Sequence, residues 1–124
     1  MSEKTILYIE DNEYNRKIVR QLLSRTSYRL IEAVDGESGV AQAQQELPDL
    51  ILMDVQLPKM SGLDATRLLK ADPRTGHIPI IVITSFALSG DREKASAAGA
   101  NSYLAKPYSP RELLALVRQF LPEP

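Results

Sequence analysis

Apolar residues in this chain fall into short unbroken runs that alternate with longer segments in which they recur at helical spacing. The run at 50–54 reads Leu-Ile-Leu-Met-Asp, and four apolar residues in a row are typical of a short strand buried on both faces. Pro58 and Gly62 follow, so the chain has to turn beyond the strand. Asp54 is therefore left at the carboxyl end of a buried strand, and we take it as the candidate chemical centre.

The same pattern predicts strands and helices in regular alternation. Strands are expected at Thr5–Ile9, Tyr28–Val34, Leu50–Asp54, Ile78–Thr84 and Ser102–Ala105. Helices are expected at about Tyr14–Arg25, from the N-cap Asp35 to Glu46, and at Leu63–Ala71, Ser89–Ala98 and Pro110–Leu121. Asn12 is a candidate N-cap for the first helix, and Gly99 is a candidate C-terminal glycine for the fourth.

Strand and helix units joined by short connections predict an α/β domain with a doubly wound parallel sheet and helices on both faces. Ligands of such sheets bind outside the carboxyl ends of the strands, where the strand order reverses. The chemically useful residues predicted at those ends are Glu10, Asp11, Asp54, Thr84 and Lys106.

The composition narrows the function classes. The 124 residues are expected to form one domain, 1–124, and 15 Lys and Arg against 16 Asp and Glu give no general attraction to nucleic acid or anionic lipid. The absence of cysteine excludes disulfides and thiolate metal sites. No signal peptide or membrane span is apparent in the sequence, so we expect a soluble, cytoplasmic protein.

Several carboxylates gathered in one crevice repel one another and need a positive partner. Oxygen ligands without His or Cys suit a hard cation, and so few protein carboxylates suit Mg²⁺, which shares phosphate oxygens and keeps several waters. A carboxylate can also attack phosphorus to give an aspartyl phosphate. In that chemistry Lys106 would supply charge and Thr84 a hydrogen bond.

The residues Glu10, Asp11, Asp54, Thr84 and Lys106, in this order and with Pro58, Gly62 and Pro107 beside them, resemble the receiver domain of two-component response regulators. The resemblance covers roughly residues 5 to 121 and implies a flavodoxin-like sheet with strand order 2-1-3-4-5. It implies that Asp54 accepts a phosphoryl group from a phosphohistidine on a sensor histidine kinase or a His phosphotransfer protein. The chain would thus be a phosphorelay response regulator and a phosphoprotein.

The family also implies a ligand set for Mg²⁺, with Mn²⁺ as a substitute. Asp11 and Asp54 would bind the ion directly, Glu10 would hold it through water, and the Gln56 main-chain carbonyl would add a ligand. Glu10 departs from the Asp found in many receivers, which lengthens one acidic side chain without removing its charge.

Further roles follow from the same resemblance. Lys106 and Thr84 would contact the phosphoryl group, and Tyr103 would be an aromatic switch that turns inward when Thr84 moves. The face formed by the fourth helix, fifth strand and fifth helix would report the phosphorylation state. Gln56 and Phe86 would flank the path of the hydrolytic water, and we expect Phe86 to slow self-dephosphorylation. Such self-catalysed acceptance and slow loss of phosphate differ from conventional enzyme turnover.

Some residues keep a second interpretation. Tyr103 is nearly as well explained as a partly buried strand aromatic that never moves. Asn12 and Asn15 either cap the first helix or reflect a pattern similar to that of hybrid-kinase receivers and small relay regulators. His77, the single histidine, is expected on the surface before the fourth strand.

Other classes with this fold fit less well. A flavin-binding module would need helix amides free for an anion after the first strand, where Glu10 and Asp11 would repel it. A phosphatase with an Asp nucleophile would place a second acid at position 56, which is Gln56. Two arrangements stay open: a free-standing regulator, and a receiver excised from a hybrid histidine kinase that passes phosphate to a His phosphotransfer domain. The chain ends after the last helix with no DNA-binding domain, so we expect a downstream protein target, and weak homodimerisation is left open.

Overall fold

The computed structural model describes residues 3–85 and 90–123, and their elements alternate as the sequence predicts. The strands are β1 (Thr5–Ile9), β2 (Arg29–Ala33), β3 (Leu50–Asp54), β4 (Ile80–Thr84) and β5 (Ser102–Ala105). The helices are α1 (Glu13–Leu23), α2 (Gly36–Glu46), α3 (Gly62–Ala71), α4 (Asp91–Ala97) and α5 (Pro110–Phe120). All pairings are parallel, and the strand order is β2-β1-β3-β4-β5, which confirms the expected doubly wound sheet.

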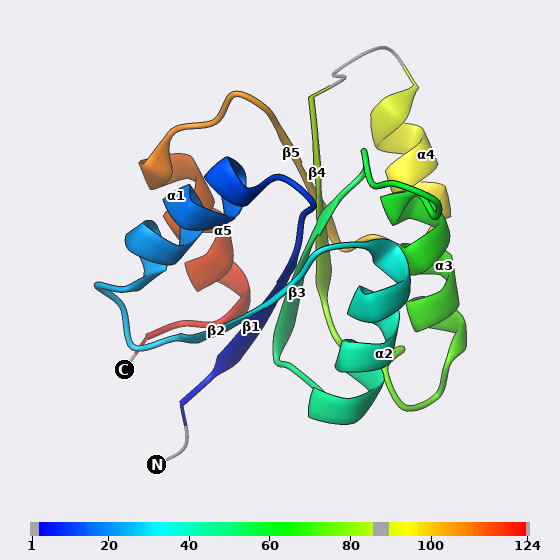
Figure 1. Ribbon diagram of the computed structural model, residues 1–124, viewed down its shortest axis with the longest axis horizontal. Coiled ribbons are helices and arrows are strands. Elements are labelled where there is room, and N and C mark those ends of the chain that lie inside the picture. Colours follow the sequence, from blue (N-terminus) through cyan, green and yellow to red (C-terminus); the bar gives the residue numbers. More distant parts are fainter. Residues whose placement is uncertain (1–2, 86–89, 124) are drawn as a thin grey trace.

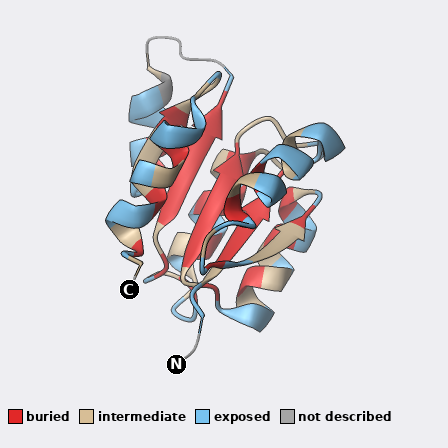
Figure 2. Ribbon diagram, turned by 90° about the vertical axis from the view of Figure 1, so that its left-hand side faces the viewer, coloured by how far each residue is buried: buried red, intermediate tan, exposed pale blue. Residues whose placement is uncertain are grey.

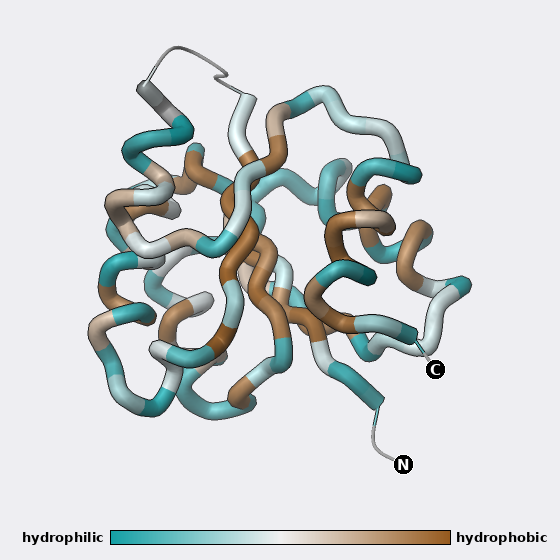
Figure 3. Tube along the Cα trace, turned by 180° about the vertical axis from the view of Figure 1, so that it is seen from behind, coloured by the Kyte–Doolittle hydropathy of each residue, from teal (hydrophilic) through white to brown (hydrophobic). Residues whose placement is uncertain are grey.

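The sheet separates two layers of helices. Figure 1 shows α1 and α5 on one face and α2, α3 and α4 on the other. Figure 2 shows buried strands between helices with exposed outer sides, and the hydropathy colouring of Figure 3 places the most apolar segments in the same central layer. Because successive side chains of a strand point to opposite faces, each strand contributes to both cores.

Residues of β1 illustrate this division. Ile6 and Tyr8 pack in the core on the α1 and α5 side, with helix residues such as Val19 and Val117. Leu7 and Ile9 pack in the core on the α2, α3 and α4 side. Every residue of β3 and β4 is buried, as expected for central strands of a parallel sheet with both faces covered.

Side chains fix several helix starts. Asn12, Asp35 and Ser61 each accept a hydrogen bond from the backbone N–H three residues later, which satisfies a donor that the helix itself leaves free. Ser109 and Glu112 form a reciprocal capping box at the start of α5. Gly99 has a φ of 101°, so the left-handed residue predicted after α4 is confirmed.

Some predicted boundaries were wrong by one or two residues. The first helix ends at Leu23 rather than Arg25, because the Thr26 backbone and hydroxyl both donate to the Leu23 carbonyl. The fourth strand begins at Ile80 rather than Ile78. The Ile78 N–H already donates to Thr75, and Pro79 has no N–H to give to the sheet.

The remaining corrections concern residues at the ends of elements. The second strand is two residues shorter than Tyr28–Val34, and its last carbonyl, on Ala33, accepts from the Glu10 N–H. The third helix begins at Gly62, one residue before Leu63, because Ser61 caps it. The last helix ends at Phe120, since Leu121 has left helical geometry. The fourth begins at Asp91, and the predicted start at Ser89 lies outside the described residues.

Within residues 3–85 and 90–123, no helix combines the length and apolar character needed to cross a bilayer. The expected cytoplasmic location is not tested by this observation and stays a prediction.

Candidate functional site

The carboxyl edge of the sheet brings together all five residues singled out at predicted strand ends. Glu10 and Asp11 follow β1, Asp54 and Thr84 are the last residues of β3 and β4, and Lys106 follows β5. β1 lies between β2 and β3, so the strand order reverses at this place. The site therefore occupies the position at which doubly wound sheets bind ligands.

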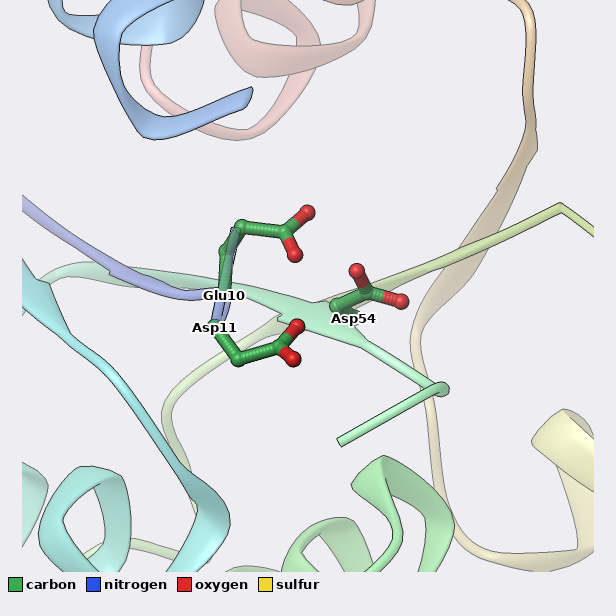
Figure 4. Close-up of side chains that lie close together, drawn as sticks. All are labelled: Glu10, Asp11 and Asp54. Carbon is green, nitrogen blue, oxygen red and sulfur yellow. The ribbon is translucent and has the colours of Figure 1, made fainter. Parts of the chain in front are cut away.

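Three carboxylates converge there. One oxygen each of Glu10, Asp11 and Asp54 lies within 4.8 Å of the other two. Figure 4 shows their side chains directed toward a common space from the ends of β1 and β3. This clustering agrees with the expectation from the sequence and keeps acids from separate segments of the chain within reach of one ion.

Glu10 is held by a dense set of donors. It is 1% exposed, and its Oε1 accepts hydrogen bonds from Lys106 Nζ at 3.1 Å, from the Tyr8 hydroxyl at 3.2 Å and from Asn15 Nδ2 at 3.3 Å. Its Oε2 accepts from the Asn12 backbone N–H at 3.2 Å. A buried carboxylate needs such partners, because burying an unpaired charge is costly.

Asp54 is buried at the end of β3, and both of its oxygens are oriented. Oδ2 accepts from Lys106 Nζ at 3.0 Å, and Oδ1 accepts from the Gln56 backbone N–H at 3.0 Å. The Lys106 ammonium therefore bridges Asp54 and Glu10. Burial alone would lower the pKa of Lys106, but the hydrogen bond and charge of Asp54, together with Glu10, raise it above its ordinary value.

Asp11 differs from the other two acids because it is exposed. Its pKa is raised, first by loss of hydration in the crevice, then by a hydrogen bond that the protonated form of Asp11 donates to Glu10, and by the charge of Glu10, while Lys106 acts in the opposite direction. The raised pKa means that the surroundings of Asp11 disfavour its charged form. A cation beside Asp11 would stabilise the charged form.

These observations support a hard-cation site. The Lys106 ammonium can compensate one of the three carboxylates, and the remaining negative charge lies on oxygen ligands. An all-oxygen donor set with partial solvent access fits Mg²⁺. Glu10, Asp11 and Asp54 are the side chains that would hold the ion.

Thr84 lies beside Asp54 in the neighbouring strand and is 2% exposed. Its Oγ1 accepts a hydrogen bond from Gln56 Nε2 at 3.0 Å, while Gln56 Oε1 accepts from the Ser85 N–H at 3.2 Å. The Gln56 side chain thus joins the segment after β3 to the end of β4. The sequence did not predict this contact, because it depends on the path of two loops. The proposed role of the Gln56 main-chain carbonyl as a ligand stays a prediction.

Tyr103 does not belong to the cluster itself. It lies on β5 opposite Val82 of β4, is half-buried, and has the Arg92 guanidinium 5.1 Å from its ring centroid. Its role as a switch stays a prediction. Phe86 lies outside the described residues, so the structure does not test its expected role.

Asn12 and Asn15 each had two interpretations from the sequence, and His77 was expected on the surface. The capping role of Asn12 is confirmed, since its Oδ1 accepts from the Asn15 N–H at 2.9 Å. Asn15 in addition donates from its side chain to Glu10. His77 is exposed in the loop before β4, so its expected surface position is confirmed.

Two contacts of Glu10 were missed from the sequence. Tyr8 sits within an apolar run and was interpreted only as part of a strand, although residues two apart on a strand share a face and Glu10 follows at that spacing. Arg16 donates from Nη1 to the Glu10 carbonyl at 2.8 Å. That contact has no comparable signal, because it requires the helix to fold back over the end of β1.

With this geometry established, the comparisons with known proteins agree with the resemblance found in the sequence. Residues 6–118 match the family described as the response regulator receiver domain, and the chain belongs to that family. It is 39% identical over 118 residues to the polar-differentiation response regulator DivK of Brucella anthropi, covering 95% of this chain and 96% of that protein. The DivK of Brucella ovis is similar to the same extent.

Solved structures show the same fold. The receiver domain of a sensor histidine kinase from Pseudomonas aeruginosa, with a magnesium ion coordinated in its active site cleft, is 38% identical with a TM-score of 0.88 and covers 96% of this chain and 98% of its own. A putative response regulator from Chloroflexus aurantiacus is 30% identical with a TM-score of 0.91, covering 97% and 98%. The chemotaxis protein CheY4 of Vibrio cholerae is 27% identical with a TM-score of 0.90, covering 97% and 100%.

Proposed function

We propose that this receiver takes up a phosphoryl group on Asp54 from the phosphohistidine of a sensor histidine kinase or His phosphotransfer protein. The observation that carries the proposal is the bridge from Lys106 Nζ to Asp54 Oδ2 at 3.0 Å beside the acidic cluster. This bridge supports the proposal because the carboxylate that would act as the nucleophile lies beside a positive charge at the edge of the sheet where ligands bind.

In the transfer, an Asp54 oxygen forms a bond to phosphorus while the P–N bond to the donor imidazole breaks. The imidazole carries a proton on its other ring nitrogen, so it leaves as a neutral ring with the electron pair of that bond. Lys106 stabilises negative charge on the phosphoryl oxygens, and the Thr84 hydroxyl, which accepts from Gln56 Nε2, donates to one of them. Residues 1–124 act as one receiver domain in this scheme.

The proposed cofactor is Mg²⁺ held by Glu10, Asp11 and Asp54, with the Gln56 carbonyl as a further ligand. When bound, the ion would neutralise charge on the phosphoryl oxygens. Support comes from the oxygen donor set in this chain and from the magnesium ion in the similar kinase receiver. Mn²⁺ is expected to substitute, and a response regulator named Rcp1, 30% identical with a TM-score of 0.80, has been solved in a Mn²⁺-bound form.

For the output, we propose the surface formed by α4, β5 and α5, with Tyr103 and Thr84 as the switch pair. Tyr103 is only half-buried, and Arg92 of α4 covers its ring, so a change of Tyr103 rotamer would alter this surface. A protein target that reads this surface would bind the phosphorylated and unphosphorylated forms differently.

The lifetime of the phosphorylated state is proposed to depend on Gln56 and Phe86. Gln56 already spans from the end of β3 to Thr84 and Ser85, where it can restrict the approach of water. Phe86 offers no hydrogen bond and would screen the acyl phosphate. If Phe86→Ala leaves the decay rate of the phosphorylated protein unchanged, the part assigned to Phe86 is wrong.

The main test is incubation with a small phosphodonor and Mg²⁺, followed by intact mass. Wild type is expected to gain one phosphate, Asp54→Asn none, and Lys106→Ala far less than wild type. Chelation of Mg²⁺ is expected to abolish the gain. Equal phosphorylation of wild type and Asp54→Asn would overturn the proposal.

The similarity to a sensor-kinase receiver favours a second arrangement, in which the domain belongs to a hybrid kinase and passes phosphate onward. The direction of transfer separates the two. Phosphorylated protein mixed with an unphosphorylated His phosphotransfer domain should lose its phosphate rapidly to that domain in the hybrid arrangement. In the free-standing arrangement, the phosphorylated form should instead bind its own protein target.

A further inference from the structure

The buried hydroxyl of Tyr8 lies directly behind the acidic cluster. Tyr8 is fully buried on β1, and its hydroxyl donates to Glu10 Oε1 at 3.2 Å. Tyr8 and Glu10 are two residues apart along an extended segment, so both side chains lie on the α1 and α5 side of the sheet. This geometry directs a neutral donor at one ligand from within the core.

Glu10 Oε1 is contacted from three directions. Lys106 donates from the end of β5, Asn15 from α1, and Tyr8 from β1. Lys106 is partly exposed and is shared with Asp54, while the Asn15 contact is only partly buried. Of these three contacts, the one from Tyr8 is made within the protein interior, where Tyr108 is a further hydrogen-bond neighbour of the Tyr8 hydroxyl.

Because Glu10 shares Lys106 with Asp54, loss of the Tyr8 contact with Glu10 would also affect Asp54. A buried carboxylate that loses one donor draws more strongly on those that remain. Without the Tyr8 hydroxyl, Glu10 would compete harder for the Lys106 ammonium, which also binds Asp54. The Glu10 side chain would also lose the donor that fixes its orientation.

We propose that Tyr8 is a positioning residue, whose hydroxyl holds Glu10 in the orientation used for Mg²⁺ and leaves Lys106 available to Asp54. The inference rests on the magnesium site of the proposed function and extends it to a residue that reaches the ion only through Glu10. It agrees with the general behaviour of outer partners that orient metal ligands.

The test is Mg²⁺ affinity, measured by calorimetric titration of the metal-free protein well below its unfolding temperature. Tyr8→Phe keeps the ring and removes the hydroxyl, and we expect it to weaken Mg²⁺ binding about tenfold. The matched control is Tyr28→Phe. The Tyr28 hydroxyl is also in a buried hydrogen bond, but it donates to the Leu121 carbonyl and not to a residue of the acidic cluster. This control is expected to lose stability and to keep wild-type Mg²⁺ affinity.

A double-mutant cycle tests whether Tyr8 changes Mg²⁺ affinity through Glu10. In a Glu10→Gln background, Tyr8→Phe should change Mg²⁺ affinity by less than about twofold, because the group that it positions has already been altered. The carboxyl ¹³C resonance of Glu10 in the metal-free protein should shift in Tyr8→Phe and stay in place in Tyr28→Phe.

Unchanged or tighter Mg²⁺ binding by Tyr8→Phe, with wild type binding normally, overturns the inference alone. An equal loss in Tyr8→Phe and Tyr28→Phe also overturns it, because the effect would then follow from reduced stability. Wild type that binds no Mg²⁺ overturns the proposed function and this inference together.

Discussion

Burial separates the three acids of the cluster into two kinds. Glu10 and Asp54 are almost fully buried and share the Lys106 ammonium, whereas Asp11 is exposed, and the negative charge of Glu10 affects its pKa more than the positive charge of Lys106 does. The two buried acids are thus compensated within the protein. Asp11 is the member whose charge depends most on an external cation.

Asp11→Asn should therefore stabilise the metal-free protein at neutral pH. The raised pKa of Asp11 means that the folded state binds its proton more tightly than the unfolded state does. Stability is accordingly lost as the pH rises through the range between the ordinary and the raised value. Removing the charge should recover up to about 1 kcal/mol, after allowance for solvent screening. Thermal unfolding with a chelator present measures this, and a variant less stable than wild type would contradict it.

Gly62 allows the start of α3 to approach the end of β3. A Cβ at this position would lie 2.0 Å from the Asp54 carbonyl oxygen and 2.9 Å from the Val55 Cα, both backbone atoms that cannot move aside cheaply. Gly62→Ala should destabilise the protein by about 2 kcal/mol or more. Urea unfolding provides the measurement. Leu68→Ala, at a half-exposed position on the same helix, is the control and should cost much less, so equal losses would contradict the explanation.

At the scale of elements, the capping box of α5 should contribute to stability. The Ser109 hydroxyl accepts from the Glu112 N–H at 3.1 Å, and Glu112 Oε1 accepts from the Ser109 N–H at 2.9 Å. Ser109→Ala removes one of these bonds and should cost about 1 kcal/mol. Chemical denaturation measures it against Ser96→Ala, an exposed serine within α4. A Ser109→Ala protein as stable as this control would show that the cap contributes nothing.

The sequence predicted elements best where apolar character and turn chemistry agreed. β3 was correct to the residue because a buried apolar run ends sharply at Asp54, and α2 was correct because Asp35 is a strong cap. The error at Ile78 has a physical cause. Ile78 is buried like a strand residue, but its N–H bonds within a turn, and burial alone does not distinguish the two.

The sequence predicted which residues come together in the site, because parallel strands bring their carboxyl ends to one edge of the sheet. The partners of those residues were less predictable. The Gln56 contact with Thr84 depends on loop geometry, and the Tyr8 contact was concealed because tyrosine in an apolar run is usually core. Hydrogen-bond partners require distances, which a pattern of residue types does not contain.

At the scale of the whole molecule, a cation that binds only the folded acidic cluster should stabilise the entire domain. At a free Mg²⁺ concentration of about ten times its dissociation constant, the gain is about 1.4 kcal/mol. Thermal unfolding at increasing Mg²⁺ measures it, with Asp11→Asn as the variant that should respond least. An identical response of both proteins, or none in wild type, would contradict the assignment of the cluster as a metal site.

The proposed function depends most on which residue accepts the phosphoryl group. Phosphorylated protein treated with borohydride should carry homoserine in place of aspartate at position 54, because an acyl phosphate is reduced to the alcohol, and peptide mass should locate it there. Homoserine at position 54 is the predicted result. Phosphate uptake with no homoserine in that peptide, or with the modified residue elsewhere in the chain, would contradict the central claim.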